Sequence, residues 1–175
     1  MRNVTPVDDR KKLLNVIVET PKGRRNKFKY DEARDCFKLS KVLPAGTAFP
    51  FDFGFLPQTA APDGDPLDVV LLMDEQAFPG CLVQARVIGI IQAEQGRNGR
   101  RIRNDRIIAV AAAETNYKKL RSHRDIDPRL LTEYEHFFVS YHSLKGKKYH
   151  IRGVHGPRLA MRILKRARQR FHKTK

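Results

Sequence analysis

The stretch DGDPLDVVLL (residues 63–72) places three aspartates within six positions, directly before an apolar run. The apolar residues favour a buried strand over residues 67–74, which would hold the carboxylates at the mouth of a rigid element. Carboxylates so close together repel one another, and in a folded site a cation compensates them. Oxygen ligands favour a hard cation, Mg²⁺ or alternatively Mn²⁺, over zinc. A solvent-exposed Asp-Gly turn before a strand is the alternative interpretation.

The segments on either side of this stretch have the pattern of short strands. Residues 13–20, 81–96 and 106–114 are rich in β-branched and other apolar side chains, and residues 27–43 favour two short strands around a polar turn. Residues 45–66 combine Pro, Gly and Phe, so we expect this segment to lie against the fold with Phe49, Phe51, Phe53 and Phe55 partly buried. This part of the chain predicts an all-β barrel or sandwich.

The C-terminal part changes to a helical period. Asp127 as N-cap and Pro128 at the first position predict a helix over residues 127–146. A second, basic helix is predicted at about residues 157–172, with one apolar side that we expect to pack on the barrel rather than on a membrane. We therefore expect residues 1–175 to form a single domain, mainly β with flanking helices (α+β).

Composition narrows the class of protein further. The chain has 175 residues, of which 41% are hydrophobic and 31% charged, as is typical of a globular domain. No apolar run reaches the roughly 18–20 residues that span a bilayer, and the first residues lack the pattern of a signal peptide. Only Cys36 and Cys81 are present, so no disulfide framework is indicated. We expect a cytoplasmic protein without a membrane span.

Positive charge is unevenly distributed along the chain. The formal net charge is +16, no acidic residue follows Glu135, and residues 97–106 contain five arginines. Such runs form either a solvated face or a surface for a polyanion, such as nucleic acid, polyphosphate or an anionic membrane. Composition alone does not choose between these partners.

Several ordered motifs together resemble a known family. They are E-T-P at 19–21, K-F-K-Y at 27–30, F-P-F-D-F-G-F at 49–55, D-G-D-P-L-D at 63–68 and H-F-F-V-S-Y-H-S-L-K-G-K at 136–147. Over roughly residues 13–153 the chain resembles the soluble, metal-dependent family I inorganic pyrophosphatases, as a divergent member. The resemblance implies a five-stranded OB-like β-barrel with two C-terminal helices. It also implies hydrolysis of pyrophosphate by metal-activated water with Mg²⁺, and a homo-oligomer, commonly a hexamer.

The resemblance assigns roles to particular residues. Asp65 matches the carboxylate that orients or deprotonates the attacking water, and Asp63, Asp68 and Glu19 match positions that bind metal. Lys29 and Tyr141 match positions that contact phosphate. Each has a structural alternative: Glu19 and Lys29 as charges on a strand face, and Tyr141 as a core residue.

Other positions depart from the family pattern. Among substrate-binding positions, the usual arginine is Lys41, which lacks a bidentate fork, one lysine is His142 and another is Arg106. Two tyrosines are replaced by Phe49 and Phe53. One metal-binding aspartate falls on Asn104, with Asp105 beside it, and a second has only Glu94 as a candidate. Weaker metal binding is expected, and we hypothesise that Arg100, Arg101 and Arg103 neutralise phosphate charge instead.

Two functions follow from these observations. The first is a Mg²⁺-dependent inorganic pyrophosphatase, whose substrate is pyrophosphate or a related phosphoanhydride. The alternative is a pyrophosphatase-like protein with an altered substrate, such as polyphosphate or a nucleoside polyphosphate, or a weakly active protein that binds nucleic acid or another polyanion. The altered loop at residues 93–106 and the acid-free C-terminal stretch motivate the alternative.

Overall fold

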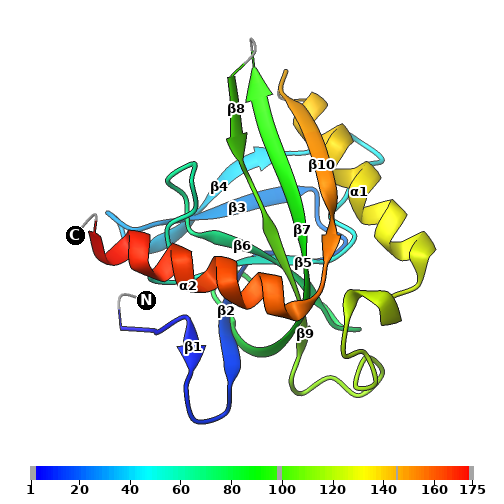
Figure 1. The fold of residues 1–175 in the computed structure, drawn as a ribbon. Coiled ribbons are helices and arrows are strands. Elements are labelled where there is room, and N and C mark those ends of the chain that lie inside the picture. Colours follow the sequence, from blue (N-terminus) through cyan, green and yellow to red (C-terminus); the bar gives the residue numbers. More distant parts are fainter. Residues whose placement is uncertain (1–2, 98–99, 145, 174–175) are drawn as a thin grey trace.

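A closed ring of strands forms the body of the protein. The computed structural model describes residues 3–97, 100–144 and 146–173. Strands β2 (Leu13–Thr20), β5 (Asp52–Leu56), β6 (Leu67–Leu72), β9 (Arg106–Ala111) and β7 (Leu82–Arg97) pair in that order. The additional pairing of β2 with β7 closes the ring (Figure 1). The expectation of a five-stranded OB-like barrel is confirmed.

Five further strands lie outside this ring in the part of the chain that the structure describes. At the N-terminal end, β1 (Val7–Asp8) pairs with β2, and β3 (Asn26–Asp31) with β4 (Cys36–Val42) forms a separate hairpin. β8 (Arg100–Arg103) and β10 (Lys148–His155) both pair with the long strand β7. The sequence did not predict β8 or β10.

The Phe-rich segment, which we expected to lie against the fold, contains a strand of the ring. β5 lies between β2 and β6, and the four phenylalanines at positions 49, 51, 53 and 55 are fully rather than partly buried, with exposed fractions of 1–6%. Alternation of Phe with Asp52 and Gly54 is a strand pattern that Pro50 disguises. Gly54 permits the close pairing with β2, because a Cβ there would lie 2.4 Å from the carbonyl oxygen of Ile17.

Two helices cover the barrel as predicted. Helix α1 (Pro128–Ser143) begins after Asp127, whose carboxylate accepts a hydrogen bond from the Arg129 amide at 2.8 Å. Helix α2 (Pro157–Lys173) follows β10, and a short 3₁₀ helix, η1 (His123–Asp125), precedes α1. Among the described residues, no helix is both long and apolar enough to span a bilayer.

The two helices cover two separate apolar cores. One core joins the buried face of α2, Ala160, Leu164 and Ala167, to side chains of the strand ring. The other core is aromatic and packs Phe51 and Phe53 against Phe138 of α1. Because aromatic side chains bury large areas, this second core fixes α1 firmly beside the ring. It therefore positions the polar side chains that α1 presents at its edge.

Candidate active site

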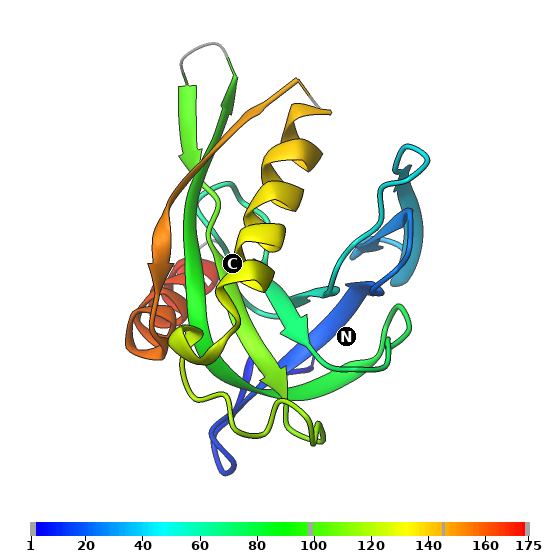
Figure 2. The same cartoon turned by 90° about the vertical axis from the view of Figure 1, so that its right-hand side faces the viewer.

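A polar cleft opens between α1, the β3–β4 hairpin and the ring. Its volume is about 430 Å³, and it is lined by Glu19 of β2, Lys27 and Lys29 of β3, Asp65 and Asp68. Arg106 of β9 and residues Phe138, Tyr141 and His142 of α1 complete its wall. In Figure 2 the hairpin and α1 stand on opposite sides of this region. The cleft thus collects side chains that are far apart in the sequence.

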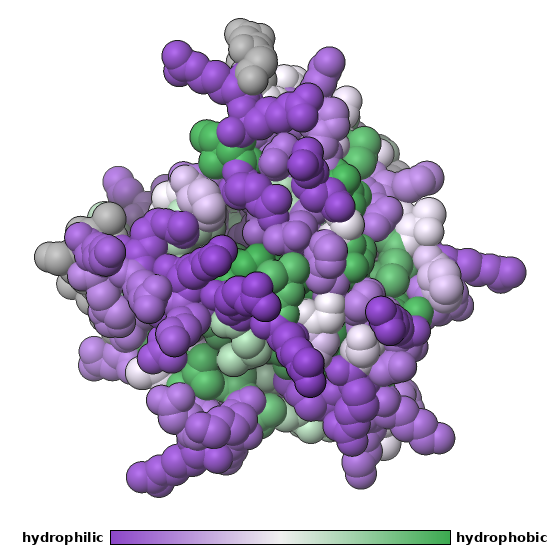
Figure 3. Space-filling view, viewed as in Figure 1, coloured by the Kyte–Doolittle hydropathy of each residue, from purple (hydrophilic) through white to green (hydrophobic). Residues whose placement is uncertain are grey.

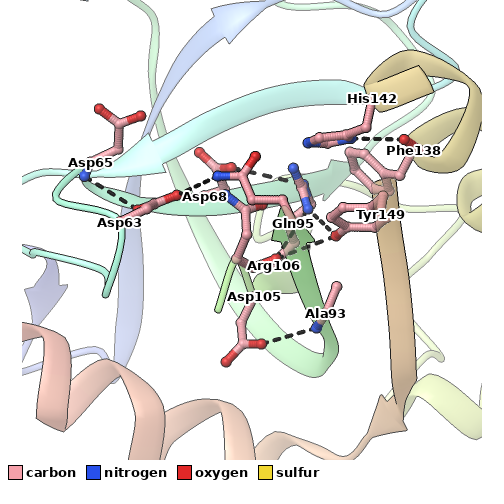
Figure 4. A network of polar contacts seen from close by, with 11 residues as sticks. Asp63, Asp65, Asp68, Ala93, Gln95, Asp105, Arg106, Phe138, His142 and Tyr149 are labelled. Carbon is pink, nitrogen blue, oxygen red and sulfur yellow. Dashed lines mark hydrogen bonds and ion pairs between the residues drawn. The ribbon is translucent and has the colours of Figure 1, made fainter. Parts of the chain in front are cut away.

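The acidic stretch, residues 63–68, lies at the edge of this cleft, and two of its aspartates accept hydrogen bonds from different partners. Asp63 accepts hydrogen bonds from Asn104 Nδ2 at 2.6 Å and from Gln95 Nε2 at 3.1 Å. Asp65 accepts one from Lys29 Nζ at 2.8 Å while its side chain stays 61% exposed. Gly64 makes this turn possible, since its φ of +89° disfavours other residues. In Figure 4 Asp63 and Asp65 lie on the turn before β6 and Asp68 lies on β6; the side chain of Asp63 extends toward Asp68, whereas that of Asp65 points away from both.

Two carboxylates deeper in the cleft have perturbed acidity. Burial raises the pKa of Glu19 to about 7, although Lys27 and a hydrogen bond from the Tyr30 amide at 2.9 Å oppose the shift. Desolvation by the surrounding protein also raises the pKa of Asp68, and the charge of the nearby Arg106 guanidinium opposes this shift. The Asp68 side chain remains 24% exposed at the floor of the cleft. Such shifts arise where carboxylates lack full compensation. The cleft therefore favours an added positive charge.

Arg106 anchors one side of the cleft floor. Its side chain is 3% exposed and lies over the rings of Phe138 and Tyr149, at 4.1 Å and 4.8 Å from their centroids. Nη1 donates to the Asn104 carbonyl at 3.1 Å and to the Tyr149 hydroxyl, and Nε lies 3.8 Å from Asp68 Oδ2. This fixed guanidinium presents its charge to the carboxylates without freedom to swing away.

Asn104 leaves one polar atom unused. Its side chain is only 9% exposed, and Nδ2 donates to Asp63, but Oδ1 has no hydrogen-bond partner among the described residues. A buried amide oxygen without a partner costs free energy unless a ligand or ion satisfies it. Asn104 is therefore a candidate donor for a cation in the cleft.

Not every predicted site residue lies in this cleft. Asp105 faces the opposite side of the sheet, where it accepts a hydrogen bond from the Ala93 amide at 3.0 Å (Figure 4). It also accepts one from Arg103 at 2.8 Å. Lys41 pairs with Lys27 across the β3–β4 hairpin but is exposed and does not line the cleft. Asp105 and Lys41 are thus not among the residues that the fold brings together in the cleft.

Three arginines of the 93–106 segment, Arg100, Arg101 and Arg103, also lie outside the cleft. Arg101 approaches Glu94 to 4.0 Å, and Arg103 is bound to Asp105. Neither these residues nor Arg100 line the cleft, so the geometry does not support our hypothesis that they neutralise phosphate charge. Glu94 itself pairs with arginines rather than with the acidic stretch.

Tyr141 and His142 occupy neighbouring positions at the wall of the cleft. Tyr141 is 4% exposed and packs against Phe137 and Phe49, so it belongs to the aromatic core and to the cleft at once. His142 is 2% exposed, its ring stacks on Tyr149 at 4.3 Å, and Nδ1 lies 2.8 Å from the Phe138 carbonyl oxygen. Both residues are thus held rigidly by packing.

Sequence reasoning missed several residues of the cleft. Lys27 lies over the Phe53 and Tyr141 rings at 4.8 Å and 5.4 Å, and Lys147 and Gln95 also line the cavity. The signal for Lys27 was present, since K-F-K-Y places it two residues before Lys29 on the same strand face. Tyr149 was unrecognised because the strand that carries it was not predicted.

The donor set of the cleft fits a hard divalent cation, although no cage is preformed. Among the described residues, no three acidic, histidine or cysteine side chains converge closely enough to hold a metal. Glu19, Asp68 and the unpartnered Oδ1 of Asn104 nevertheless offer oxygen atoms only, and oxygen donors suit Mg²⁺ or Mn²⁺. The fit therefore rests on donor chemistry and on the raised pKa values of Glu19 and Asp68.

Comparison with known proteins places the chain among characterised relatives. The profile of a family described as inorganic pyrophosphatase matches residues 16–172. The inorganic pyrophosphatase of Synechocystis sp. is 38% identical over 148 residues, or 85% of each chain. That of Geobacillus stearothermophilus is 32% identical and covers 94% of this chain and 97% of its own length. The crystal structure of inorganic pyrophosphatase from Thermus thermophilus superimposes with a TM-score of 0.89 at 29% identity, covering 98% of both chains.

Proposed function

This chain belongs to the inorganic pyrophosphatase family, and we propose that it hydrolyses pyrophosphate to two phosphates in the cleft described above. The charge pattern of the cleft carries the proposal. Four cationic side chains, Lys27, Lys29, Arg106 and Lys147, face four acidic ones, Glu19, Glu32, Asp65 and Asp68. Pyrophosphate brings several negative charges, so a cleft of balanced charge binds it well only together with added cations.

Divalent cations supply that charge in this proposal, with Mg²⁺ as the first candidate and Mn²⁺ as the second. Glu19, Asp68 and Asn104 Oδ1 would hold such a cation, and Asp63, which accepts hydrogen bonds from Asn104 and Gln95, would add a carboxylate beside them. A bound divalent cation lowers the pKa of a water molecule and neutralises charge on phosphoryl oxygens. Asp105 lies on the other side of the sheet and is not part of this donor set.

Asp65 is the residue to which we assign the proton of the attacking water. Its carboxylate is exposed at the cleft edge and carries one hydrogen bond from Lys29, so an oxygen remains available to accept a proton. The water oxygen bonds to one phosphorus, the bridging oxygen leaves with the other phosphoryl group, and the proton passes to Asp65 and then to solvent. Two phosphates are the products, and no redox partner is required.

The lysines and Arg106 hold the two phosphoryl groups. Partial burial lowers the pKa of the Lys29 ammonium, but the hydrogen bond and charge of Asp65 outweigh it and leave the pKa above its ordinary value. Lys29 is therefore fully charged at neutral pH, and substrate competes with Asp65 for it. Arg106 is pre-oriented by its aromatic neighbours, so little side-chain entropy is lost when it binds an anion.

The test is phosphate release from pyrophosphate by the purified protein, with Mg²⁺ and Mn²⁺ varied separately. Metal-dependent release that falls at least about a hundredfold in Asp65→Asn, as loss of a general base gives, would support the proposal. Asp9→Asn, at an exposed position outside the cleft, is the matched control. Release from tripolyphosphate or a nucleoside triphosphate but not from pyrophosphate would contradict the assigned substrate. The cytoplasmic location and the homo-oligomeric state stay predictions.

A further inference from the structure

The outer face of α2 carries a continuous stripe of positive charge. Arg158, Arg162, Arg166 and Arg170 recur every four residues, and Lys165 and Lys173 fall on the same side of the helix. The opposite side holds Ala160, Leu164 and Ala167, which are at most 1% exposed. These three side chains therefore pack on the barrel, whereas the stripe faces solvent. Figure 3 shows strongly hydrophilic side chains gathered over this helix.

The stripe lacks internal compensation. Across the described residues, Arg158, Arg162, Lys165 and Arg166 have no acidic side chain within ion-pair distance. Like charges four residues apart on a helix repel one another and destabilise it. A polyanion laid along the helix would relieve this repulsion, so the face is complementary to such a partner.

A hollow beside the helix adds a further cation to the stripe. A cavity of about 320 Å³ lies between α2, the segment that precedes β6, and β8. Among the residues that the structure describes, the guanidinium-bearing side chains of Arg103, Arg166 and Arg170 line it, and Asp105 is its one carboxylate. Arg103 is held by Asp105 at 2.8 Å, which fixes one cation beside the arginines of α2. The cavity therefore offers a binding position for a phosphate group.

The same geometry argues against a membrane as the partner. A helix that lies in a membrane surface must bury its apolar side among acyl chains. Here the buried apolar side chains lie in the protein core, and Met161 is the one large apolar side chain that the described part of α2 leaves exposed, so charge dominates what the helix offers. From Arg158 to Lys173 the stripe extends over roughly 22 Å at 1.5 Å per residue. That length corresponds to about six base pairs of duplex at ~3.4 Å per phosphate in each strand.

We infer that the outer face of α2 binds the phosphate backbone of a double-stranded nucleic acid. No residue of α2 lines the cleft in which pyrophosphate is hydrolysed, so this surface is separate from the active site. Binding is non-specific in base sequence, because it rests on charge alone, and it leaves turnover of pyrophosphate unchanged. The inference does not depend on the proposed chemistry.

The test measures fluorescence anisotropy of a labelled 20-base-pair duplex over a salt series, using the full chain. Each phosphate contact contributes about −0.9 to the slope of log K against log salt concentration. We expect Arg162→Gln combined with Arg166→Gln to reduce the slope by about 2 and to weaken binding at least tenfold at about 0.1 M salt. Glutamine has a helix propensity close to that of arginine, and unchanged pyrophosphate turnover would confirm that the variant is folded.

The control is Lys118→Gln combined with Lys119→Gln, which removes the same charge from exposed positions outside α2. This control should bind the duplex almost as the unaltered chain does. Equal weakening in both variants would show that net charge alone attracts the duplex and would overturn the inference. So would the absence of binding at about 50 mM salt, or binding to phosphatidylserine vesicles without binding to the duplex.

Discussion

Replacement of Asn104 by Asp tests the cleft with a change of a few atoms. In the structure, Asn104 Nδ2 donates to Asp63 Oδ2 at 2.6 Å, and its buried Oδ1 has no partner among the described residues. Asn104→Asp replaces this donor by a second carboxylate that faces Asp63. The same change adds a charged oxygen for a divalent cation. The variant should therefore respond in opposite ways without and with metal.

The cost in the metal-free protein can be worked from these contacts. The lost hydrogen bond involves a charged acceptor and is worth about 1.5–3 kcal/mol. Two like charges ~4 Å apart near a protein surface add up to about 4 kcal/mol, which rotation of the side chains or protonation reduces. We expect a net loss of about 2–4 kcal/mol at pH 8. At roughly 2–4 °C per kcal/mol for a chain of this length, the melting temperature should fall by about 4–16 °C.

The assay is thermal unfolding at pH 8 in a chelator and again in excess Mg²⁺, each repeated near pH 5. The loss in Asn104→Asp should shrink near pH 5, where one carboxylate is protonated, and should be largely recovered in Mg²⁺. Asn104→Ala is the matched control, since it loses the hydrogen bond and gains no charge, so Mg²⁺ should not rescue it. An Asn104→Asp variant that is as stable as the unaltered chain in chelator, or that Mg²⁺ fails to rescue, would refute the geometry described for this site.

Three further predictions follow from individual contacts. Because the pKa of Glu19 is about 7 in the folded protein, above its ordinary 4.5, the metal-free protein should lose stability as pH rises from about 4.5 to 7, at ~1.4 kcal/mol per unit. Urea unfolding of Glu19→Gln in chelator should show a flatter pH profile. Lys27→Met should raise KM for pyrophosphate about tenfold or more by removing a charged donor, as initial rates would show. Gly54→Ala should cost at least about 1–3 kcal/mol, since its Cβ meets a backbone oxygen at 2.4 Å, and equal urea midpoints would contradict this.

Most of the fold could be predicted from sequence patterns. The strand expected at 13–20 has those bounds in β2, and Asp127 caps α1 as expected. β10 escaped prediction because its register shifts between Ile151 and Gly153, and such a bulge interrupts the period of two on which strand prediction depends. β8 (RRIR) has almost no apolar pattern that would reveal a strand. It is recognised only by its pairing with β7.

Many residues of the candidate site could be predicted from the sequence, but the face of the sheet on which each side chain lies could not. Asp65, Asp68, Glu19 and Lys29 were named from motifs, and the structure brings all four to one cleft. Asn104 and Asp105 are neighbours, and successive side chains of an extended chain face opposite ways. Only the register of β9 decides that Asn104 faces the cleft and Asp105 the α2 side. The choice between Lys27 and Lys41 depends likewise on how the β3–β4 hairpin twists, including its register shift between Lys27 and Phe28.

The closed ring of strands has a consequence for how the protein is made. β2 closes onto β7, and β6 pairs in parallel with β9, so the ring requires contacts between residues far apart in the chain. Such topologies fold slowly, because long loops must close before their contacts form. A growing chain that ends before β9 leaves the apolar edge of β6 without its partner. Until residue 111 has left the ribosome, the edges of β6 and β7 that β9 will occupy are exposed to other chains, and this period is when aggregation competes most strongly with folding.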